Sequence, residues 1–558
     1  MKKIILTGFI IIITLYFGFS QTDTDIEKIK IFTDRDLYIT GENILTGLVL
    51  ISDKNMDNSV SFSKIVFVEL FDKKQTSILK RKVKLINNSS EIFLKIPDNI
   101  DTDNYFLIAY TKHQKYSCQN SLTGKIINII NPNYIRFDVD TTIYSSKLIP
   151  VDKDIVNKGV KISLNRKKYK TRENVDLRIF FSDIKRPGNY KYILSVVRKG
   201  TINNIPLKII PEKILKTNNI SNFLNEKRLN LSGILTDKET NNPIQDKEIY
   251  LSGLNSEKQI HVVKTNSYGR FNFSLYNFNG IKDFYLRTEP EVDNAKIQIY
   301  NEFLNSCIPE KKVNFHLSVN KKTLIEEMFL NQQLSHLEGS KKNFFLIKTD
   351  TLISQFGKPD FKIYLKNFVK LPTLHEVFDE IIPSVRVREE NHKYVLSIYD
   401  EALSLNYNKP LILLDNIPVF NVDDILKIKP SLINNIEIIN KMYISGNKIF
   451  NGIIILNSNS DKFCRISLPE NAKFFRYQGF TNFSHPIFPE YNTSEKKKSK
   501  IPDFRNTLYW ESGNLPNKGN MIINFFTSDY CAEYVVNLYL TDKKGHIIKN
   551  TKTFIVEK

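Results

Sequence analysis

Two stretches of the sequence decide the fold, and they share one pattern: Asp36-Leu37-Tyr38-Ile39-Thr40-Gly41-Glu42-Asn43-Ile44 and Lys167-Lys168-Tyr169-Lys170-Thr171-Arg172-Glu173-Asn174-Val175. Both contain Tyr-x-Thr-x-Glu-Asn followed by an aliphatic residue. Each leads into a strand-like stretch that ends in Ser-Asp, at Ser52-Asp53 and at Ser182-Asp183. A motif that recurs in the same context indicates a repeated structural unit. We therefore predict two sandwich domains of one type in tandem.

The surrounding sequence is typical of β-strands. Runs of β-branched and aromatic residues are bounded by polar turn residues, for example at 65–70, 105–110 and 192–197. Such runs are the usual sequence signal of strands. We predict a mainly β protein made of tandem β-sandwich domains, with one small α+β domain further along the chain.

The first copy resembles the macroglobulin-type domain of α2-macroglobulin relatives. The resemblance rests on Asp34-Arg35-Asp36-Leu37-Tyr38, on Gly41-Glu42 and on 104–110 near the domain end. In that family the Tyr-x-x-Gly-Glu piece is a turn between strands, where Gly41 takes a positive φ at little cost. The second copy has Arg172 there, so its turn must differ or be strained. Peptidase-trapping members carry a Gly-Cys-x-Glu-Gln thioester motif, which Cys118-Gln119 does not match. The resemblance therefore implies the fold and not the trap.

A third module resembles the carboxypeptidase regulatory-like domain, a small prealbumin-like sandwich. The segments that carry the resemblance are Leu231–Asp237, Pro243-Ile244, Ile249–Ser252 and Thr265–Phe273. The Asp that is usual in its Thr-Asp-x-x-Gly-x-Phe piece is Asn266 here. We expect Gly269 to make a hairpin turn, with Phe271 and Phe273 on one face of the following strand.

Residues 370–460 begin with a helix signal. Thr373-x-x-Glu376 is a capping box. The apolar residues that follow have helical spacing and stop before Pro383; they are Leu374, Val377, Phe378 and Ile381. An earlier helix is expected after Asn320.

After that helix the sequence resembles the plug domain of TonB-dependent outer-membrane receptors. The matching segments are Pro410–Val419, Ile436–Ile439, Ser445-Gly446 and Asn451–Leu456. Turns are expected at Asp415-Asn416, Gly446 and Asn451-Gly452. A receptor barrel of ~22 strands needs over ~220 residues, and far fewer follow Asn459. We therefore expect a plug-like domain without a barrel.

The complete prediction divides the chain into seven parts. They are a signal peptide (1–20), a macroglobulin-type sandwich (21–145), a second such sandwich (155–225), a regulatory-like sandwich (228–305), a partly helical connector (306–369), a plug-like α+β domain (370–460) and a C-terminal immunoglobulin-like β domain (461–558). This order resembles a family of Bacteroidetes envelope proteins that join macroglobulin-type, regulatory-like and plug-like domains, and the resemblance implies no particular activity.

The N-terminus indicates export. Lys2 and Lys3 precede the apolar run 4–19, and Gly18 and Ser20 have the spacing that a signal peptidase needs before Gln21. We expect the mature chain in the periplasm or associated with the outer membrane, with no integral membrane segment after cleavage. A membrane anchor is the alternative, but the run is shorter than the ~20 residues of a spanning helix.

The net charge of +20 suggests anionic partners. The lysines are scattered, however, and no basic helix emerges, so we predict no nucleic-acid binding. The four cysteines lie far apart, without a CxxC pair, and one per module favours buried free thiols over disulfides. Trp510, the single Trp, is expected to be a core or inter-domain anchor rather than a ligand platform.

No catalytic motif is present, and we predict no enzyme, no cofactor and no metal site. The sequence lacks a Gly-x-Ser-x-Gly elbow, a P-loop, a dinucleotide fingerprint and His-Glu-x-x-His. The eight His residues are isolated, at 113, 261, 316, 336, 375, 392, 485 and 546. We expect an interaction or scaffold protein that binds another envelope protein or a surface glycan. Two alternatives stay open: a peptidase-binding protein of macroglobulin descent without a thioester, and a hydrolase with an unrecognised carboxylate site.

Overall fold

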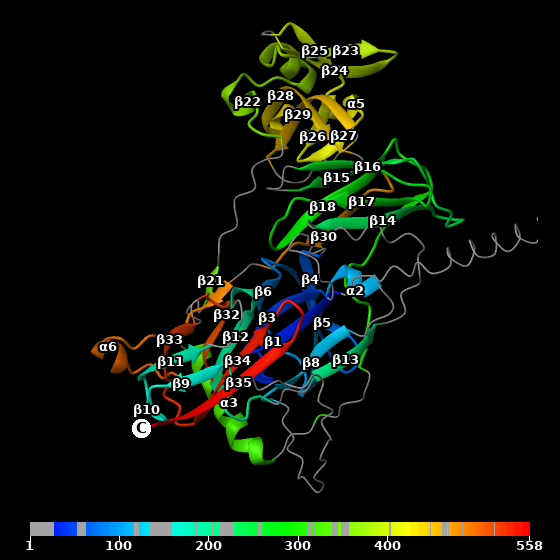
Figure 1. The fold of residues 1–558 in the computed structure, drawn as a ribbon. Coiled ribbons are helices and arrows are strands. Elements are labelled where there is room, and N and C mark those ends of the chain that lie inside the picture. The colour runs from blue at the N-terminus through cyan, green and yellow to red at the C-terminus, as the bar shows by residue number, and fades with distance from the viewer. Residues whose placement is uncertain are drawn as a thin grey trace, which may run out of the picture.

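The protein is mainly β and consists of three sandwiches and one α+β unit (Figure 1). The computed structural model describes residues 27–52, 63–116, 122–133, 159–181, 184, 187–202, 206–211, 228–254, 259–309, 315, 319–337, 344–346, 356–400, 403–446, 448–459, 466, 468–481, 484–517 and 519–558. The predicted signal peptide lies outside these residues, as do Cys118, Gln119 and Cys464. Within them, no helix is long and apolar enough to cross a membrane.

The first sandwich is built mostly from 27–130. Its strands are β1 (Glu27–Thr33), β2 (Leu37–Ile39), β3 (Asn43–Ser52), β4 (Ile65–Phe71), β5 (Ser77–Lys84), β6 (Ser89–Lys95), β7 (Asp103–Tyr110), β8 (Leu122–Ile130), β13 (Pro206–Pro211) and β20 (Cys307–Pro309). One sheet has the order β1-β3-β6 and the other β20-β13-β8-β7-β4-β5, with β2 beside β8. Strands β13 and β20 come from outside the predicted 21–145 domain. Two helices flank this sandwich, α2 (Lys112–Tyr116) and α3 (Lys322–Leu337), the latter preceded by η3 (Val319–Lys321).

The second sandwich combines two distant parts of the chain. Its strands are β9 (Lys161–Leu164), β10 (Lys168–Lys170), β11 (Asn174–Phe180), β12 (Lys191–Arg198), β32 (Thr507–Asn514), β33 (Asn520–Phe526), β34 (Glu533–Thr541) and β35 (Ile547–Glu557), with η1 (Pro187–Asn189). The sheet orders are β10-β35-β34-β12-β32 and β33-β11-β9. The structure therefore corrects the prediction of separate domains at 155–225 and 461–558. Four strands from one segment leave the core half open, and the C-terminal strands close it.

The third sandwich contains the predicted regulatory-like segment. Its strands are β14 (Asn230–Asp237), β15 (Glu248–Gly253), β16 (Ile260–Lys264), β17 (Arg270–Ser274), β18 (Ile281–Glu289), β19 (Ala295–Ile299) and β30 (Lys473–Gln478). The sheets are β17-β14-β19 and β16-β15-β18-β30, so β30 is donated from the predicted C-terminal domain. Phe271 and Phe273 are both buried, as predicted. Gly269 has a φ of +66°, but the strands on either side of it join different sheets, so the predicted hairpin is wrong.

The α+β unit covers 356–459. Its elements are β22 (Phe361–Tyr364), η4 (Leu365–Asn367), α4 (Leu374–Glu376), η5 (Val377–Ile381), β23 (Val385–Glu390), β24 (Lys393–Asp400), β25 (Leu405–Asn408), β26 (Leu411–Leu414), β27 (Ile417–Val419), α5 (Val422–Leu426), η6 (Pro430–Leu432), β28 (Ile433–Ser445) and β29 (Lys448–Ser458). The predicted helix N-cap at Thr373 is confirmed, because the Thr373 side chain accepts a hydrogen bond from the Glu376 backbone N–H. A five-stranded sheet, β22-β28-β29-β26-β27, accompanies a three-stranded one, β23-β24-β25.

Two of the three turns predicted in this unit are confirmed. Asp415 and Asn416 have φ values of 48° and 69° between β26 and β27, and Gly446 has a φ of 59° between β28 and β29. The third prediction is wrong, because Asn451 and Gly452 lie inside β29. Gly452 keeps a positive φ of 82° there, where the ladder with β28 is irregular between Ile439 and Met442.

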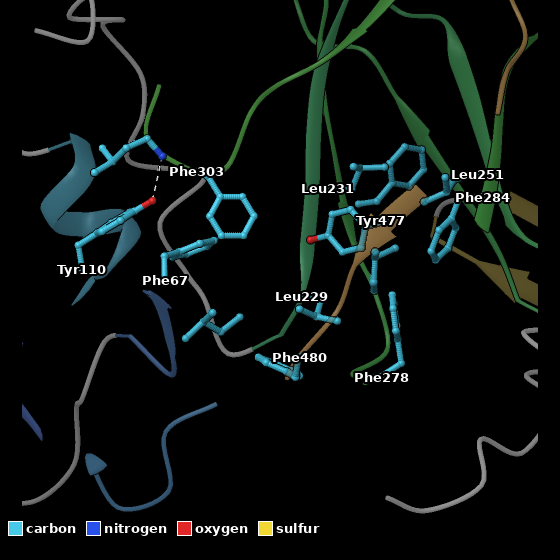
Figure 2. Close-up of a cluster of buried hydrophobic side chains, with 14 of the residues drawn as sticks. Phe67, Tyr110, Leu229, Leu231, Leu251, Phe278, Phe284, Phe303, Tyr477 and Phe480 are labelled. Carbon is cyan, nitrogen blue, oxygen red and sulfur yellow. Dashed lines mark hydrogen bonds between the residues drawn. The ribbon is translucent and has the colours of Figure 1, made fainter. Parts of the chain in front are cut away.

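Hydrophobic cores join these units. The first and second sandwiches meet around Trp510, which is 3% exposed and belongs to a cluster with Phe32 and Ile193. The predicted role of Trp510 as an inter-domain anchor is confirmed. The first and third sandwiches share a cluster in which Phe303 packs edge-on against Phe67 (Figure 2).

The remaining short elements are β21 (Phe344–Leu346), paired with β31 (Ser484–Pro486), and α6 (Ser494–Lys497).

The loop 301–304 fastens the third sandwich to the first. The Leu304 backbone N–H donates to the Tyr110 hydroxyl at 2.9 Å (Figure 2). It also donates to the Glu69 carboxylate at 2.9 Å. Glu302 forms ion pairs with Lys82 and Lys112. Because these charges are nearly buried, removing one partner would leave an uncompensated charge in the junction.

Candidate functional site

A cleft of about 1200 Å³ separates the third sandwich from the α+β unit. Strands β15 and β18 form its sandwich wall. The facing wall comes from β24, β26, β27 and β29. One side is lined by residues that precede β30 in the chain: Ile466, Leu468, Pro469 and Glu470. Three parts of the chain thus meet at one site.

Four side chains form the centre of the sandwich wall. In the antiparallel ladder Glu248 lies opposite Glu289, and Tyr250 lies opposite Arg287. Side chains on alternate residues of a strand share a face, so this block of four faces the cleft together. Arg287 pairs with Glu289 at 2.5 Å. Glu248 accepts a hydrogen bond from the Tyr250 hydroxyl at 3.0 Å and pairs with Lys448 of the facing wall at 2.9 Å.

Burial has the largest effect on the protonation of this block, and crowding of like charges adds to it. Burial raises the pKa of Glu289, the pairing with Arg287 lowers it, and neighbouring Glu291 and Glu248 raise it further. Two carboxylates directly opposite each other in a ladder repel. The cations Arg287 and Lys448 offset that repulsion, one for each carboxylate. Burial also raises the pKa of Tyr250, so its hydroxyl stays a hydrogen-bond donor.

Lysines are prominent on the facing wall. Lys393 and Lys409 are exposed, and neither forms an ion pair among the described residues. Asp424 is the acidic residue of this wall. The sandwich wall has four carboxylates, those of Asp246, Glu248, Glu289 and Glu291. A ligand in the cleft would therefore meet charged groups of both signs.

Few aromatic faces are open to a ligand. Tyr250 is 1% exposed and packs edge-on against Phe420 with ring centres 4.9 Å apart. The Arg287 guanidinium covers the Phe420 ring at 4.9 Å. Tyr394 is the exception, at 40% exposure, with His375 tilted against it. The cleft thus offers charge and hydrogen bonding more than stacking surfaces.

An apolar interface beside the cleft connects the two walls. Tyr250, Ile260 and Val262 of the third sandwich pack in one cluster with Leu413 and Ile453 of the α+β unit. The Ser445 hydroxyl, at the end of β28, donates to the Ile260 carbonyl at 2.9 Å. A continuous core of this kind positions the walls relative to each other.

No residue of the cleft was predicted as a site residue from the sequence, because the lining comes from separate segments of the chain. Its residues come from 246–291, 393–450 and 466–470, and nothing in a single sequence indicates that these segments meet. The regular spacing of Glu248-x-Tyr250 and Arg287-x-Glu289 was the available signal, because each pair places two polar groups on one strand face. His375 is 43% exposed in a first helical turn and lies 3.7 Å from Asp379. Cys531 is a free thiol, but it is exposed, so the predicted burial is wrong for this residue.

No protein-family model and no curated protein matches the sequence. The resemblances to regulatory-like and plug domains therefore stay predictions. Solved structures similar to the chain include the Salmonella alpha-2-macroglobulin reacted with methylamine, at 8% identity and a TM-score of 0.23, covering 95% of this chain and 39% of that one. The trypsin-activated alpha-2-macroglobulin from Escherichia coli has 8% identity and a TM-score of 0.23, and the match covers 95% of this chain and 42% of that one. The Escherichia coli adhesin FdeC has 9% identity and a TM-score of 0.15, and the match covers 51% of this chain and 65% of that one. The chain thus spans about two fifths of the length of these macroglobulins, and similarity at this level assigns no function to it.

Proposed function

We propose that the protein is a non-catalytic interaction scaffold of the bacterial envelope, and that the cleft between its third sandwich and its α+β unit holds an extended segment of a partner protein. The supporting observation is the lining of the cleft, where carboxylates face unpaired lysines across about 1200 Å³. A polypeptide carries both charge signs and exposed backbone groups, so it can satisfy both walls at once.

The same lining favours a peptide over a glycan. Sugar rings bind well where aromatic faces are open, and here Phe420 is covered by Arg287 while Tyr250 is buried. An outer-membrane or periplasmic location supports an envelope protein as the partner, and rests on the predicted signal peptide at 1–20.

The experiment uses site-specific photo-crosslinking in native cells. A photoreactive residue replaces Tyr394 in the cleft, and a matched control replaces Ile522, which is 57% exposed on the second sandwich. We expect Tyr394 to capture one exported protein, with the crosslink mapped by mass spectrometry to a single segment. A synthetic peptide of that segment should bind the purified chain, and Lys393→Glu with Lys409→Glu should weaken binding about tenfold. Equal capture from both positions, or affinity unchanged by charge reversal, would contradict the proposal.

One observation favours a second candidate, a carboxylate hydrolase. Burial raises the pKa of Glu289, which lies opposite Glu248 in the ladder, and Glu248 pairs with Lys448 at 2.9 Å. Pairs of neighbouring carboxyl groups in different environments serve as acid and base in glycosidases. The pairing of Glu289 with Arg287 argues for a structural role instead. Turnover of a glycan or peptide library that Glu289→Gln abolishes, while the photo-crosslink persists, would establish the hydrolase.

A further inference from the structure

The most exposed large apolar side chain among the described residues is Val369, at 83%. It follows η4 at the edge of the five-stranded sheet, where β22 is the outermost strand. Phe368 beside it is 48% exposed, and Phe361 on β22 is 47% exposed. Scattered single apolar residues are normal on a protein surface, whereas a run of them marks a contact surface. We name the segment 361–370 the edge loop.

Lysines surround these apolar side chains at regular spacing. Lys358, Lys362, Lys366 and Lys370 recur every four residues. Lys362 pairs with Glu437 of β28 at 2.9 Å. Lys366 and Lys370, which flank Phe368 and Val369, are exposed, and neither has an ion-pair partner within the described ranges. The tip of the edge loop is therefore Lys-Asn-Phe-Val-Lys, two protruding apolar side chains between two exposed positive charges, with Lys366 Nζ 5.9 Å from the centre of the Tyr364 ring.

Protection of a sheet edge explains only part of this arrangement. Lysines on an edge strand discourage unwanted strand pairing, and Lys362 can serve that purpose. Phe368 and Val369 lie beyond the ladder, which ends at the pair Tyr364–Asn435. Exposed apolar groups there would promote aggregation rather than prevent it, so they need another explanation.

We propose that the edge loop docks on the surface of an anionic lipid bilayer, with Phe368 and Val369 entering the headgroup region and Lys366 and Lys370 contacting lipid phosphates. A side chain that is 83% exposed protrudes, and a folded partner would need a matching pocket for it. A bilayer is fluid and needs none. Aromatic and apolar groups beside lysines are the combination that binds the interface of anionic membranes.

The position of the edge loop fits attachment from one end of the molecule. Strand β22 lies on the α+β unit, which is at the far end of the molecule from the first and second sandwiches (Figure 1). Attachment there would leave both sandwiches projecting away from the membrane. The proposal is independent of the cleft, because neither Phe368 nor Val369 lines it.

The test uses the full chain and vesicles of defined composition. Flotation compares vesicles of phosphatidylcholine alone with vesicles that also contain the anionic lipid phosphatidylglycerol. We expect binding to the anionic vesicles only, weakened by added salt. Phe368→Ser with Val369→Ser, and separately Lys366→Gln with Lys370→Gln, should each reduce partitioning about tenfold. Ile522→Ser and Lys496→Gln with Lys497→Gln are matched controls on the second sandwich and α6, and should leave binding unchanged.

A second measurement locates the insertion. The native Trp510 is buried, so a Val369→Trp chain gains a reporter that vesicles with brominated acyl chains should quench. Quenching at position 369 with loss of binding in both edge-loop variants supports the proposal. Binding that depends on Lys496 and Lys497 instead, absent quenching, or equal binding to soluble polyglutamate would overturn it.

Discussion

The hydroxyl groups of Tyr38 and Tyr169 organise the same turn twice. Each accepts a hydrogen bond from a backbone N–H three residues earlier at 3.1 Å, and donates to the side chain four residues earlier at 2.6 Å. In each copy a glutamate, Glu42 or Glu173, forms an ion pair with the arginine seven residues earlier. The same glutamate accepts a hydrogen bond from a backbone N–H at 2.7 Å. The repeat is therefore longer than its visible core, since Asn165-Arg166 matches Asp34-Arg35 in position and in contacts. The substitution of Asn for Asp hid this correspondence in the sequence.

In the second turn Arg172 takes the place of Gly41. Both residues have a positive φ, 54° for Arg172 and 82° for Gly41. The predicted strain is present, and side-chain bonds offset it. The guanidinium binds both oxygens of Asp529 at 2.6–2.7 Å and donates to the carbonyls of Ser499 and Ile501 at 2.6 Å. We expect Arg172→Gly to lower the free energy of unfolding by about 2–4 kcal/mol, because lost charged hydrogen bonds outweigh the strain relieved. Urea unfolding followed by Trp510 fluorescence reports on this sandwich.

The control for Arg172 is another residue with positive φ that has no such partners. Asn391 has a φ of 52° in the exposed turn between β23 and β24. Asn391→Gly should be neutral or slightly stabilising, since only strain is relieved. Arg172→Lys should recover part of the stability but not the two-point contact with Asp529. A stabilised Arg172→Gly chain would show that the strain dominates.

His261 gives the third sandwich a sensitivity to acid. Burial lowers the pKa of this side chain to about 4, from about 6.5 in the unfolded chain. Between these values the unfolded state binds a proton that the folded state does not, so stability falls as the pH drops from 6.5 to 4. His261→Gln should remove about 2–3 kcal/mol of this dependence. Amide hydrogen exchange of β16, compared between the two chains at each pH, measures it. Parallel pH profiles would contradict the assignment.

At the scale of elements, local signals predicted well where a short segment decides its own structure. The cap at Thr373 and the turn at Asp415-Asn416 depend on neighbouring residues and are confirmed. The Asn451-Gly452 prediction failed because the same dipeptide also suits an irregular strand, and the partner strand β28 decides between the two. That partner lies outside any local window.

Gly452 is the element-scale test of this irregular ladder. A Cβ there would lie 2.7 Å from Ile398 Cδ1 and 3.1 Å from the Ile439 carbonyl oxygen, at a φ of +82°. Gly452→Val should therefore destabilise the α+β unit by about 3–5 kcal/mol, from strain and crowding together. Gly280→Val is the matched control, because Gly280 has a φ of +79° and nothing within 4 Å of its Cβ position. The control should lose only the strain contribution, about 1–3 kcal/mol. Equal losses in the two variants would mean that crowding at Gly452 is absent.

At the scale of the whole molecule, the sequence predicted the fold class and not the assembly. Strand content follows from local patterns, but the pairing of β12 with both β32 and β34 joins residues more than 300 positions apart. A shared core leaves no local trace, because each strand alternates in the same way whichever partner it has. The cleft could not be predicted for the same reason, since it exists only where separate units meet.

Export is a whole-molecule prediction that rests on residues 1–20. If the signal is cleaved, the protein isolated from native cells begins at Gln21, either as free Gln or cyclised to pyroglutamate. Mass spectrometry of the N-terminal peptide and fractionation of the cells measure this. A change of Ile11 and Ile12 to Lys should keep the chain in the cytoplasm, because charge in the apolar run prevents signal recognition. Intact Met1 on the protein from native cells would refute export by cleavage.

Truncation tests whether the second sandwich needs both ends of its sequence. Removing 502–558 deletes four of its eight strands, and β12 loses its neighbours on both sides. Buried residues such as Leu194 and Val196 would then face water, so the remaining strands should not fold alone. We expect amides of 161–198 to lose protection from hydrogen exchange in the truncated chain, while β14 to β18 keep theirs. Adding a separately produced 502–558 segment should restore protection, because the missing strands can pair in trans. Protected amides in 161–198 without that segment would show an independent domain, as the sequence alone had predicted.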